Sequence, residues 1–121
     1  MSERQAPDVH GRRRVTLAEA LAAPVEPGRL AATVLAHGSM EVEVYAPRGT
    51  DRQTPHDRDE LYVVAAGSGW FVNGDARHPV GPLDVLFVPA GVVHRFEDFG
   101  DDFAVWVIFY GPTGGEAARP A

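Results

Sequence analysis

The chain has 121 residues, no cysteine, and 17 acidic against 11 basic residues, which gives a formal net charge of −6. This length supports one hydrophobic core, and the lack of cysteine excludes a disulfide framework, a thiol nucleophile and a cysteine-based zinc site. The excess of negative charge argues against a nucleic-acid-binding protein, because contacts to phosphate groups need clustered basic side chains.

The beginning of the chain predicts a loose N-terminal segment over residues 1–14, because these residues are polar and show no periodic apolar pattern. The segment lacks the apolar centre of a signal peptide. No run in the chain approaches the length of about 20 apolar residues that a membrane-spanning helix needs. We therefore expect a cytoplasmic protein that does not insert into a membrane.

A short helix is predicted over residues 16–23. Thr16 and Glu19 have the spacing of a capping box, in which each side chain accepts a hydrogen bond from the backbone N–H of the other residue. An alanine- and leucine-rich run follows, and Pro24 and Pro27 end the helix within about two turns.

After Gly28 the pattern changes to short runs rich in β-branched and aromatic residues, separated by Gly, Pro, Asp and Asn. Such runs predict strands, here over residues 30–36, 40–45, 60–65, 69–72, 85–88, 94–96 and 103–109. Asn73-Gly74 predicts a hairpin turn. We expect an all-β sandwich or barrel over residues 15–112, with a flexible tail over 113–121.

Three side chains near these strands are suited to binding a metal ion. His56 lies four residues before Glu60, and His94 begins a later run. In a regular strand, His56 and Glu60 would share one face, and a second strand could bring His94 to them. Two imidazoles and one carboxylate suit Fe, Mn, Ni or Zn and leave coordination positions open for water or a substrate.

The spacing of these residues resembles that of the cupin family, in particular small single-domain cupins of the cupin 2 conserved-barrel type. The end of the family's first motif, Glu followed after six residues by Gly, matches Glu60 and Gly67, and its second histidine matches His56. The first-histidine position falls on Thr54. Position 48, where the motif begins with glycine, is occupied by Arg48.

The second motif of the family, Gly-x₅-Pro-x-Gly-x₂-His-x₃-Asn, also has a counterpart in this chain. Pro89, Gly91 and His94 match it, whereas Leu83 stands at the glycine position and Asp98 at the asparagine position. The resemblance covers roughly residues 29–112. It implies a double-stranded β-helix, a small jelly-roll barrel that encloses a pocket.

The fourth metal ligand is left open by the sequence. Thr54 shares strand parity with His56 and Glu60, but its hydroxyl is a poor ligand, so a Thr54→His change should tighten metal binding. Gln53 has a better donor in its amide oxygen but the opposite parity, unless a bulge or Pro55 rotates the strand. Water is the third candidate.

The pocket is expected to be largely apolar, with Thr54, Tyr62, Phe96 and Trp106 as contacts to a small organic ligand. One hypothesis is a metal-dependent oxygenase, isomerase or cyclase. The alternative is a non-catalytic binding or sensor domain with a degraded metal site, because the fold hosts both kinds of protein. Open sheet edges and apolar outer faces favour a homodimer.

Overall fold

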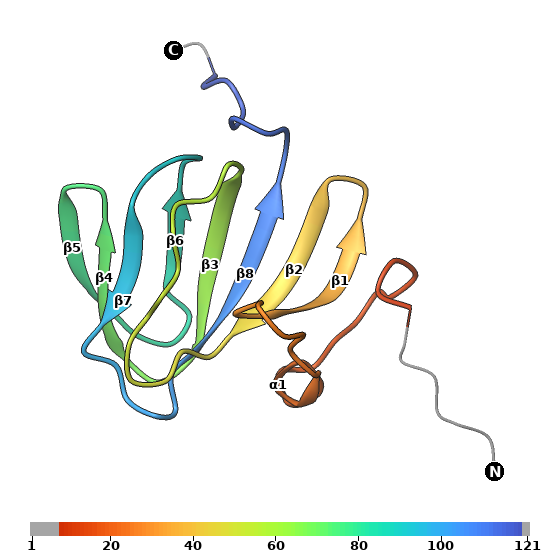
Figure 1. Ribbon diagram of the computed structural model, residues 1–121, viewed down its shortest axis with the longest axis horizontal. Coiled ribbons are helices and arrows are strands. Elements are labelled where there is room, and N and C mark those ends of the chain that lie inside the picture. The colour runs from red at the N-terminus through yellow and green to blue at the C-terminus, as the bar shows by residue number, and fades with distance from the viewer. Residues whose placement is uncertain (1–7, 120–121) are drawn as a thin grey trace.

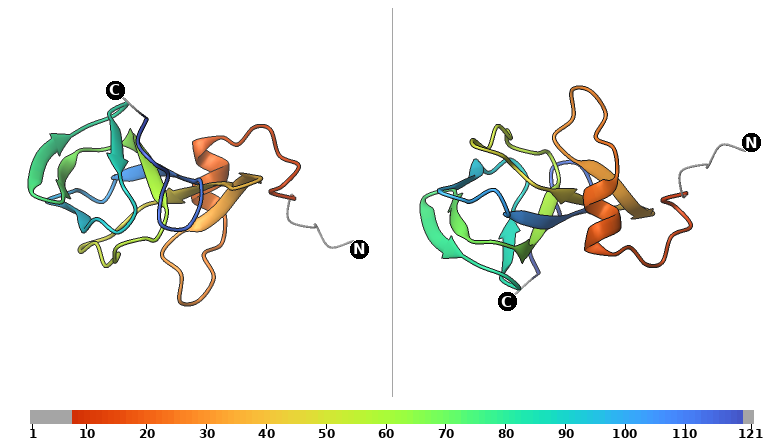
Figure 2. Two further views of the ribbon diagram at one scale, coloured as in Figure 1. Left: turned by 90° about the horizontal axis from the view of Figure 1, so that it is seen from above. Right: turned by 90° about the horizontal axis from the view of Figure 1, so that it is seen from below.

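The structure is a computed structural model that describes residues 8–119. These residues form one helix and eight strands, and the strands make two antiparallel sheets around a common core (Figures 1 and 2). The elements in chain order are α1 (Leu17–Ala22), β1 (Ala32–His37), β2 (Met40–Tyr45), β3 (Asp59–Ala66), β4 (Gly69–Asn73), β5 (Ala76–Val80), β6 (Val85–Val88), β7 (His94–Glu97) and β8 (Ala104–Tyr110). The predicted all-β class with one short N-terminal helix is confirmed.

The larger sheet has the strand order β1-β2-β8-β3-β6, and the smaller has the order β5-β4-β7. Every predicted strand is present within a few residues. The structure has one further strand, β5, which was not predicted because four of its five residues are exposed and one is Pro79. β5 pairs only with β4, with Pro79 opposite Trp70. An edge strand tolerates proline because its outward N–H has no partner to lose.

The hairpin between β4 and β5 is shifted by one residue from its predicted position. Asn73 is still paired, opposite Ala76, so the two turn residues are Gly74 and Asp75. Gly74 has a φ of +59°, which glycine adopts without steric cost. Asn73 remains in the strand and donates its side-chain amide to the carbonyl of Phe87 at 2.8 Å.

Aromatic side chains fill the space between the two sheets. Phe96 on β7 lies at the centre, with ring centroids 4.6 Å from Phe71, 5.1 Å from Tyr62 and 5.0 Å from Phe103. All four side chains are at most 2% exposed. This cluster fixes the distance between the sheets, and therefore the position of any residue that faces inward from β3 or β7.

A second, smaller cluster lies on the outer face of the larger sheet. Ala20 of α1 packs there against Val34 and Val44, and Trp106 of β8 borders them. The capping box predicted for α1 is present, with Thr16 Oγ1 accepting from the Glu19 N–H at 3.1 Å. The helix therefore covers the β1–β2 end of the sheet, as Figure 1 shows.

Both ends of the described chain are hydrogen-bonded to the sheets. The carbonyl of Val9 accepts from the N–H of Ala36 at 3.0 Å, alongside β1. At the other end, the N–H of Glu116 donates to the buried Asp59 carboxylate at 2.8 Å. The remainder of the expected loose segment, 1–7, and of the expected tail, 120–121, lies outside the described residues. In residues 8–119 no helix is long and apolar enough to cross a membrane.

Within residues 8–119, two residues other than glycine have a positive φ: Leu83 at +73° and Asp98 at +52°. They stand where the second cupin motif has glycine and asparagine, the two residue types that adopt this conformation most easily. At both positions the backbone thus has a conformation that glycine and asparagine favour, although Leu83 and Asp98 occupy them. At Leu83 this conformation costs about 1–2 kcal/mol, and the side chain, 82% exposed, recovers little by packing.

Leu83→Gly should therefore stabilise the protein. Relief of the strain exceeds the entropy that glycine adds to the unfolded chain, so we expect a gain of about 0.5–1 kcal/mol. Thermal unfolding would report this as a melting temperature higher by a few degrees. Leu83→Ala is the matched control, because it removes the side chain and keeps the strain. A glycine variant that melts no higher than the alanine variant would contradict the prediction.

Candidate metal centre

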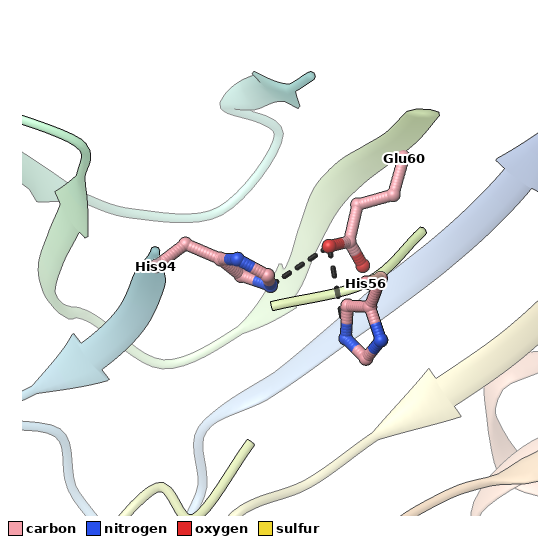
Figure 3. Close-up of side chains that lie close together, drawn as sticks. All are labelled: His56, Glu60 and His94. Carbon is pink, nitrogen blue, oxygen red and sulfur yellow. Dashed lines mark ion pairs between the residues drawn. The ribbon is translucent and has the colours of Figure 1, made fainter. Parts of the chain in front are cut away.

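Three side chains from separate parts of the chain converge between the sheets. His56 comes from the loop before β3, Glu60 from β3 and His94 from the start of β7, and one ligand atom of each lies within 4.8 Å of the others. Glu60 Oε1 lies 2.8 Å from His94 Nε2 and 3.8 Å from His56 Nε2. Figure 3 shows the carboxylate facing both imidazole rings.

A tight turn after β6 connects the two motifs that carry these residues. The N–H of Gly91 donates to the carbonyl of His56 at 2.7 Å. Gly91 has a φ of +83°, a conformation that glycine adopts without strain. Pairing of Glu60 with Val88, just before this turn, fixes β3 against β6. The predicted meeting of His56 and Glu60 with His94 therefore rests on backbone contacts between the motifs.

The strand parity expected for Thr54 does not apply, because β3 begins only at Asp59 and residues 53–56 lie in a loop. Thr54 is exposed and is not among the residues that line the cavity beside the cluster. Gln53 is turned to the cluster instead. The expectation that Thr54 and not Gln53 shares a face with His56 assumed the alternating side chains of a strand. Because these residues lie in a loop, that alternation does not apply.

The amide oxygen of Gln53 completes a set of inward-facing donor atoms. It lies 3.1 Å from His94 Nε2 and 3.4 Å from His56 Nε2, and it accepts a hydrogen bond from the hydroxyl of Tyr62 at 2.8 Å. The amide nitrogen donates in the opposite direction, to Asp51 Oδ2 at 2.7 Å. Two imidazoles, a carboxylate and an amide oxygen are thus brought together.

Hydrogen bonding fixes the tautomer of His94. Its Nδ1 lies 2.8 Å from the carbonyl oxygen of Val92, and because a carbonyl can only accept, Nδ1 carries the proton. In the neutral ring, Nε2 then directs a lone pair toward Glu60. A hydrogen bond of this kind orients metal-bound imidazoles in many proteins.

Glu60 is fully buried, and its two carboxylate oxygens are the buried side-chain atoms of residues 8–119 that have no hydrogen-bond partner. The close contact to His94 is no hydrogen bond in the neutral tautomer, since Nε2 then has no proton to donate. Burying a carboxylate without a partner is costly. A cation between Glu60, His56 and His94 would satisfy every inward-facing lone pair, so the residues present fit a divalent metal ion.

The two histidines differ in their affinity for protons. Burial lowers the pKa of His56, and the nearby Glu60 offsets this only in part. Burial acts in the same direction on His94, but the protonated ring would donate to Glu60 and to the Val92 carbonyl, and these hydrogen bonds outweigh burial and raise the pKa. Burial raises the pKa of Tyr62 as well, so its hydroxyl keeps the proton that it donates to Gln53. In metal-free protein, His94 therefore binds a proton more firmly than His56 does.

A cavity of about 310 Å³ opens beside the cluster. It is lined by Gly28, Arg29, Leu30, Ala31, Glu43, Tyr45, Gln53, His56, Glu60, Tyr62, Val107 and Phe109. Apolar atoms form the larger part of its surface, as the sequence led us to expect, and polar side chains lie among them. Among the expected contacts, Tyr62 lines the cavity, Phe96 lies in the aromatic core, and Trp106 packs in the outer cluster beside α1.

Several polar residues of this region were missed by sequence reasoning. Glu43 and Tyr45 face the cavity from β2, while Val42 and Val44 face α1. The side chains of this strand alternate regularly between the two faces. Alternation is usually taken to place the apolar side chains inward, but here the polar ones face the cavity. Asp51 is only 8% exposed, but nothing in the sequence beyond its place in a polar loop indicated that it would be buried.

Glu43 also forms an ion pair inside the cavity wall. Its Oε2 lies 2.9 Å from Arg29 Nη2. Burial raises the pKa of Glu43, and the attraction of Arg29 opposes this. A second carboxylate therefore lines the same cavity as Glu60, but this one has a partner.

Comparison with known proteins identifies a family and relatives that match the larger part of the chain. The model of the Cupin domain family (Cupin_2) matches residues 41–110. An uncharacterised protein of Streptomyces coelicolor is 38% identical over 76 residues, which are 61% of this chain and 72% of the relative.

Solved structures share the fold of this chain. A cupin-2 domain protein of Shewanella frigidimarina superimposes with a TM-score of 0.63 at 12% identity, over 80% of this chain and 94% of the other. A structure from work on the DMSP lyases RdDddP and RnDddQII superimposes with a TM-score of 0.54 at 25% identity, over 62% of this chain and 40% of the other.

Glu60→Gln should change the stability of metal-free protein in a pH-dependent way. The raised pKa of His94 means that its pairing with Glu60 stabilises the fold below the unfolded pKa of about 6.5. This contribution is lost as the pH rises through the raised folded value, and an unpaired buried carboxylate remains. The amide introduced by the substitution can donate to neutral His94. We therefore expect the free energy of unfolding of the variant, relative to that of the parent, to rise by about 1 kcal/mol as the pH increases from below about 6.5 through the raised folded pKa of His94.

Urea unfolding in the presence of a chelator measures this difference at each pH. Glu43→Gln is the matched control, because Glu43 is a buried carboxylate with a permanent cationic partner in Arg29. It should destabilise the protein with little change across the same pH range. A Glu60→Gln variant whose relative stability does not rise with pH would contradict the raised pKa of His94.

Proposed function

We propose that this chain, which belongs to the Cupin domain family, binds one divalent transition metal ion through His56, Glu60, His94 and Gln53. The adjoining cavity then takes up a small organic molecule. The observation that carries the proposal is the Glu60 carboxylate, fully buried and without a hydrogen-bond donor, facing two imidazoles. Burial of this carboxylate without a partner is unfavourable, and a bound cation would offset the lost hydration. This supports a metal site at Glu60.

The donor set narrows the choice of metal. Imidazole nitrogen with carboxylate and amide oxygen suits Fe, Mn, Ni or Zn, and no thiolate is present in the chain to favour a softer ion. Once bound, such an ion supplies Lewis acidity and open coordination positions for a ligand. The metal present in the cell then depends on availability as much as on affinity.

The cavity walls indicate the kind of molecule that would bind. Leu30, Val107 and Phe109 offer apolar contacts, while the metal ligands and Tyr45 supply polar ones. A volume of about 310 Å³ suits a small metabolite. We propose a compact, largely apolar ligand with one polar group that reaches the ion, and a reaction of the oxygenase, isomerase or cyclase type.

A second candidate is a non-catalytic binding or sensor domain. It is favoured by Gln53, because an amide oxygen at the fourth position binds a borderline metal ion more weakly than the imidazole found in the family motif. In this case the cavity would bind its ligand with the ion weakly held or lost. Metal content after purification without an affinity tag separates the two candidates.

We also propose that the chain forms a homodimer through the outer face of β3 and β6. Leu61 and Val63 lie on this face opposite Phe87 and Val85, which are 47% and 62% exposed. The small cluster under α1 lies at the other end of the sheet, around Val44. A second copy is suited to cover the apolar patch, because a two-fold axis places the same patch on both partners.

His56→Ala and His94→Ala should each lower metal content and melting temperature together. An ion bound only to the folded state stabilises it by about 2.7 kcal/mol at 100 times its dissociation constant. Loss of that term would lower the melting temperature by about 10 °C for a domain of this size. Elemental analysis and thermal unfolding with and without chelator measure both effects. Unchanged metal content in both variants would remove the site from consideration.

Gln53→His and Thr54→His form a matched pair that tests the fourth ligand in the same experiment. We expect the first to tighten metal binding by about tenfold or more in a chelator competition, because an imidazole replaces an amide oxygen. Thr54→His should leave affinity unchanged, because Thr54 is exposed and outside the cavity. If Thr54→His tightened metal binding and Gln53→His did not, Thr54 and not Gln53 would stand at the fourth ligand position.

Light scattering at micromolar concentration should give the mass of a dimer. Phe87→Glu is expected to shift the equilibrium to monomer, because it places a charge at the centre of the proposed interface. Val25→Glu is the control, since Val25 is 50% exposed and lies in the segment between α1 and β1. A monomeric parent would contradict the proposal.

A further inference from the structure

The carboxylate of Asp51 is the acceptor of four hydrogen bonds. Oδ1 accepts from the Tyr45 hydroxyl at 2.5 Å and from the Gln53 backbone N–H at 3.0 Å. Oδ2 accepts from the Gln53 side-chain amide at 2.7 Å and from the backbone N–H of Phe96 at 2.8 Å. The residue is 8% exposed, so these bonds replace its hydration almost completely.

This arrangement determines which end of the Gln53 amide faces the cluster. An ionised carboxylate can only accept, so Gln53 must present its NH₂ group to Asp51. The oxygen then faces inward, where Tyr62 donates to it and the Nε2 atoms of His56 and His94 lie 3.4 Å and 3.1 Å away. In the opposite orientation an NH₂ group would face the position of a cation and could not bind it.

Asp51 also ties the loop to the strand that carries His94. Its bond to the N–H of Phe96 reaches β7 two residues beyond that ligand. Its bond to Tyr45 reaches β2, at the wall of the cavity. The position of Gln53 relative to His94 is therefore set by one buried group that contacts both segments.

We propose that Asp51 is a positioning residue that sets the polarity of the Gln53 amide and so makes it a metal ligand. This inference rests on the proposed metal binding and adds to it a residue that does not contact the ion. Partners of this kind, hydrogen-bonded to a ligand, commonly change metal affinity by about 10–100-fold when they are replaced.

The alternative is that Asp51 only stabilises the loop. The two roles differ in their dependence on residue 53. A stabilising role requires hydrogen-bond acceptors, whatever the chemistry of that residue. A positioning role requires that residue 53 have two unlike ends, because a carboxylate presents an oxygen inward whichever way it turns.

A double-mutant cycle separates these roles. Asp51→Asn offers Gln53 a donor as well as an acceptor, so the amide loses its preferred orientation, and we expect metal affinity to fall by about tenfold or more in a chelator competition. In the Gln53→Glu background, Asp51→Asn should not lower affinity, because it replaces the repulsion between two carboxylates by a hydrogen bond from the Asn amide. An equal loss in both backgrounds would overturn the positioning role.

Asp59→Asn is the control for lost stability alone. Asp59 is buried and, like Asp51, accepts backbone hydrogen bonds, from Ala90 and Glu116. It does not contact Gln53 through any of them. This variant should melt at a lower temperature with the metal affinity of the parent. A loss of affinity as large as that of Asp51→Asn would mean that affinity follows stability, and would overturn the inference.

The orientation of the amide can also be measured without metal. In the metal-free parent, the side-chain amide protons of Gln53 should show nuclear Overhauser contacts to the N–H of Phe96 and none to the ring protons of His94. Asp51→Asn should add contacts to the His94 ring. Amide protons directed at His94 in the parent would overturn the inference even if metal binds. A parent with the expected contacts but no metal affinity would refute the proposed function alone.

Discussion

The burial of one carboxylate constrains the whole interior of this protein. Glu60 lies between the two sheets, where an isolated charge loses several kcal/mol of hydration. The surrounding residues limit that loss only in part, because the neutral imidazoles and the Gln53 oxygen present lone pairs instead of donors. The spacing of the two motifs, the Gly91 turn and the loop before β3 all serve to hold these like groups together.

The interior is consequently divided into two regions that share a residue. Tyr62 packs its ring against Phe71 and Phe96 in the aromatic core, and its hydroxyl donates to Gln53 at the edge of the ligand cluster. Packing in the apolar region holds the two sheets together. The polar region contains the buried Glu60 carboxylate, whose loss of hydration is unfavourable. A substitution of Phe96 in the core would therefore shift the metal ligands, because Phe96 packs against Tyr62 and lies on the same strand as His94.

Sequence patterns predicted those parts of the fold whose causes are local. The capping box of α1, the alternating strands and the His and Glu spacing each depend on neighbouring residues. The pattern failed at β5, whose residues are exposed, and at Thr54, where a strand was assumed and a loop is present. The inward turn of Gln53 depends on Asp51 and on a backbone group of Phe96, which is 45 positions from Asp51 and gives no signal in the loop itself.

The edge strand β5 affects how copies of this protein can meet. An exposed strand edge is a template for further strands, and through it folded chains can add to one another without limit. Here the edge carries Arg77, His78 and Pro79, which combine a charge, a bulky polar ring and a missing N–H. Continuous stacking of chains is thereby disfavoured at this edge. The protein can therefore carry the unfavourable burial of Glu60 without its β5 edge promoting aggregation.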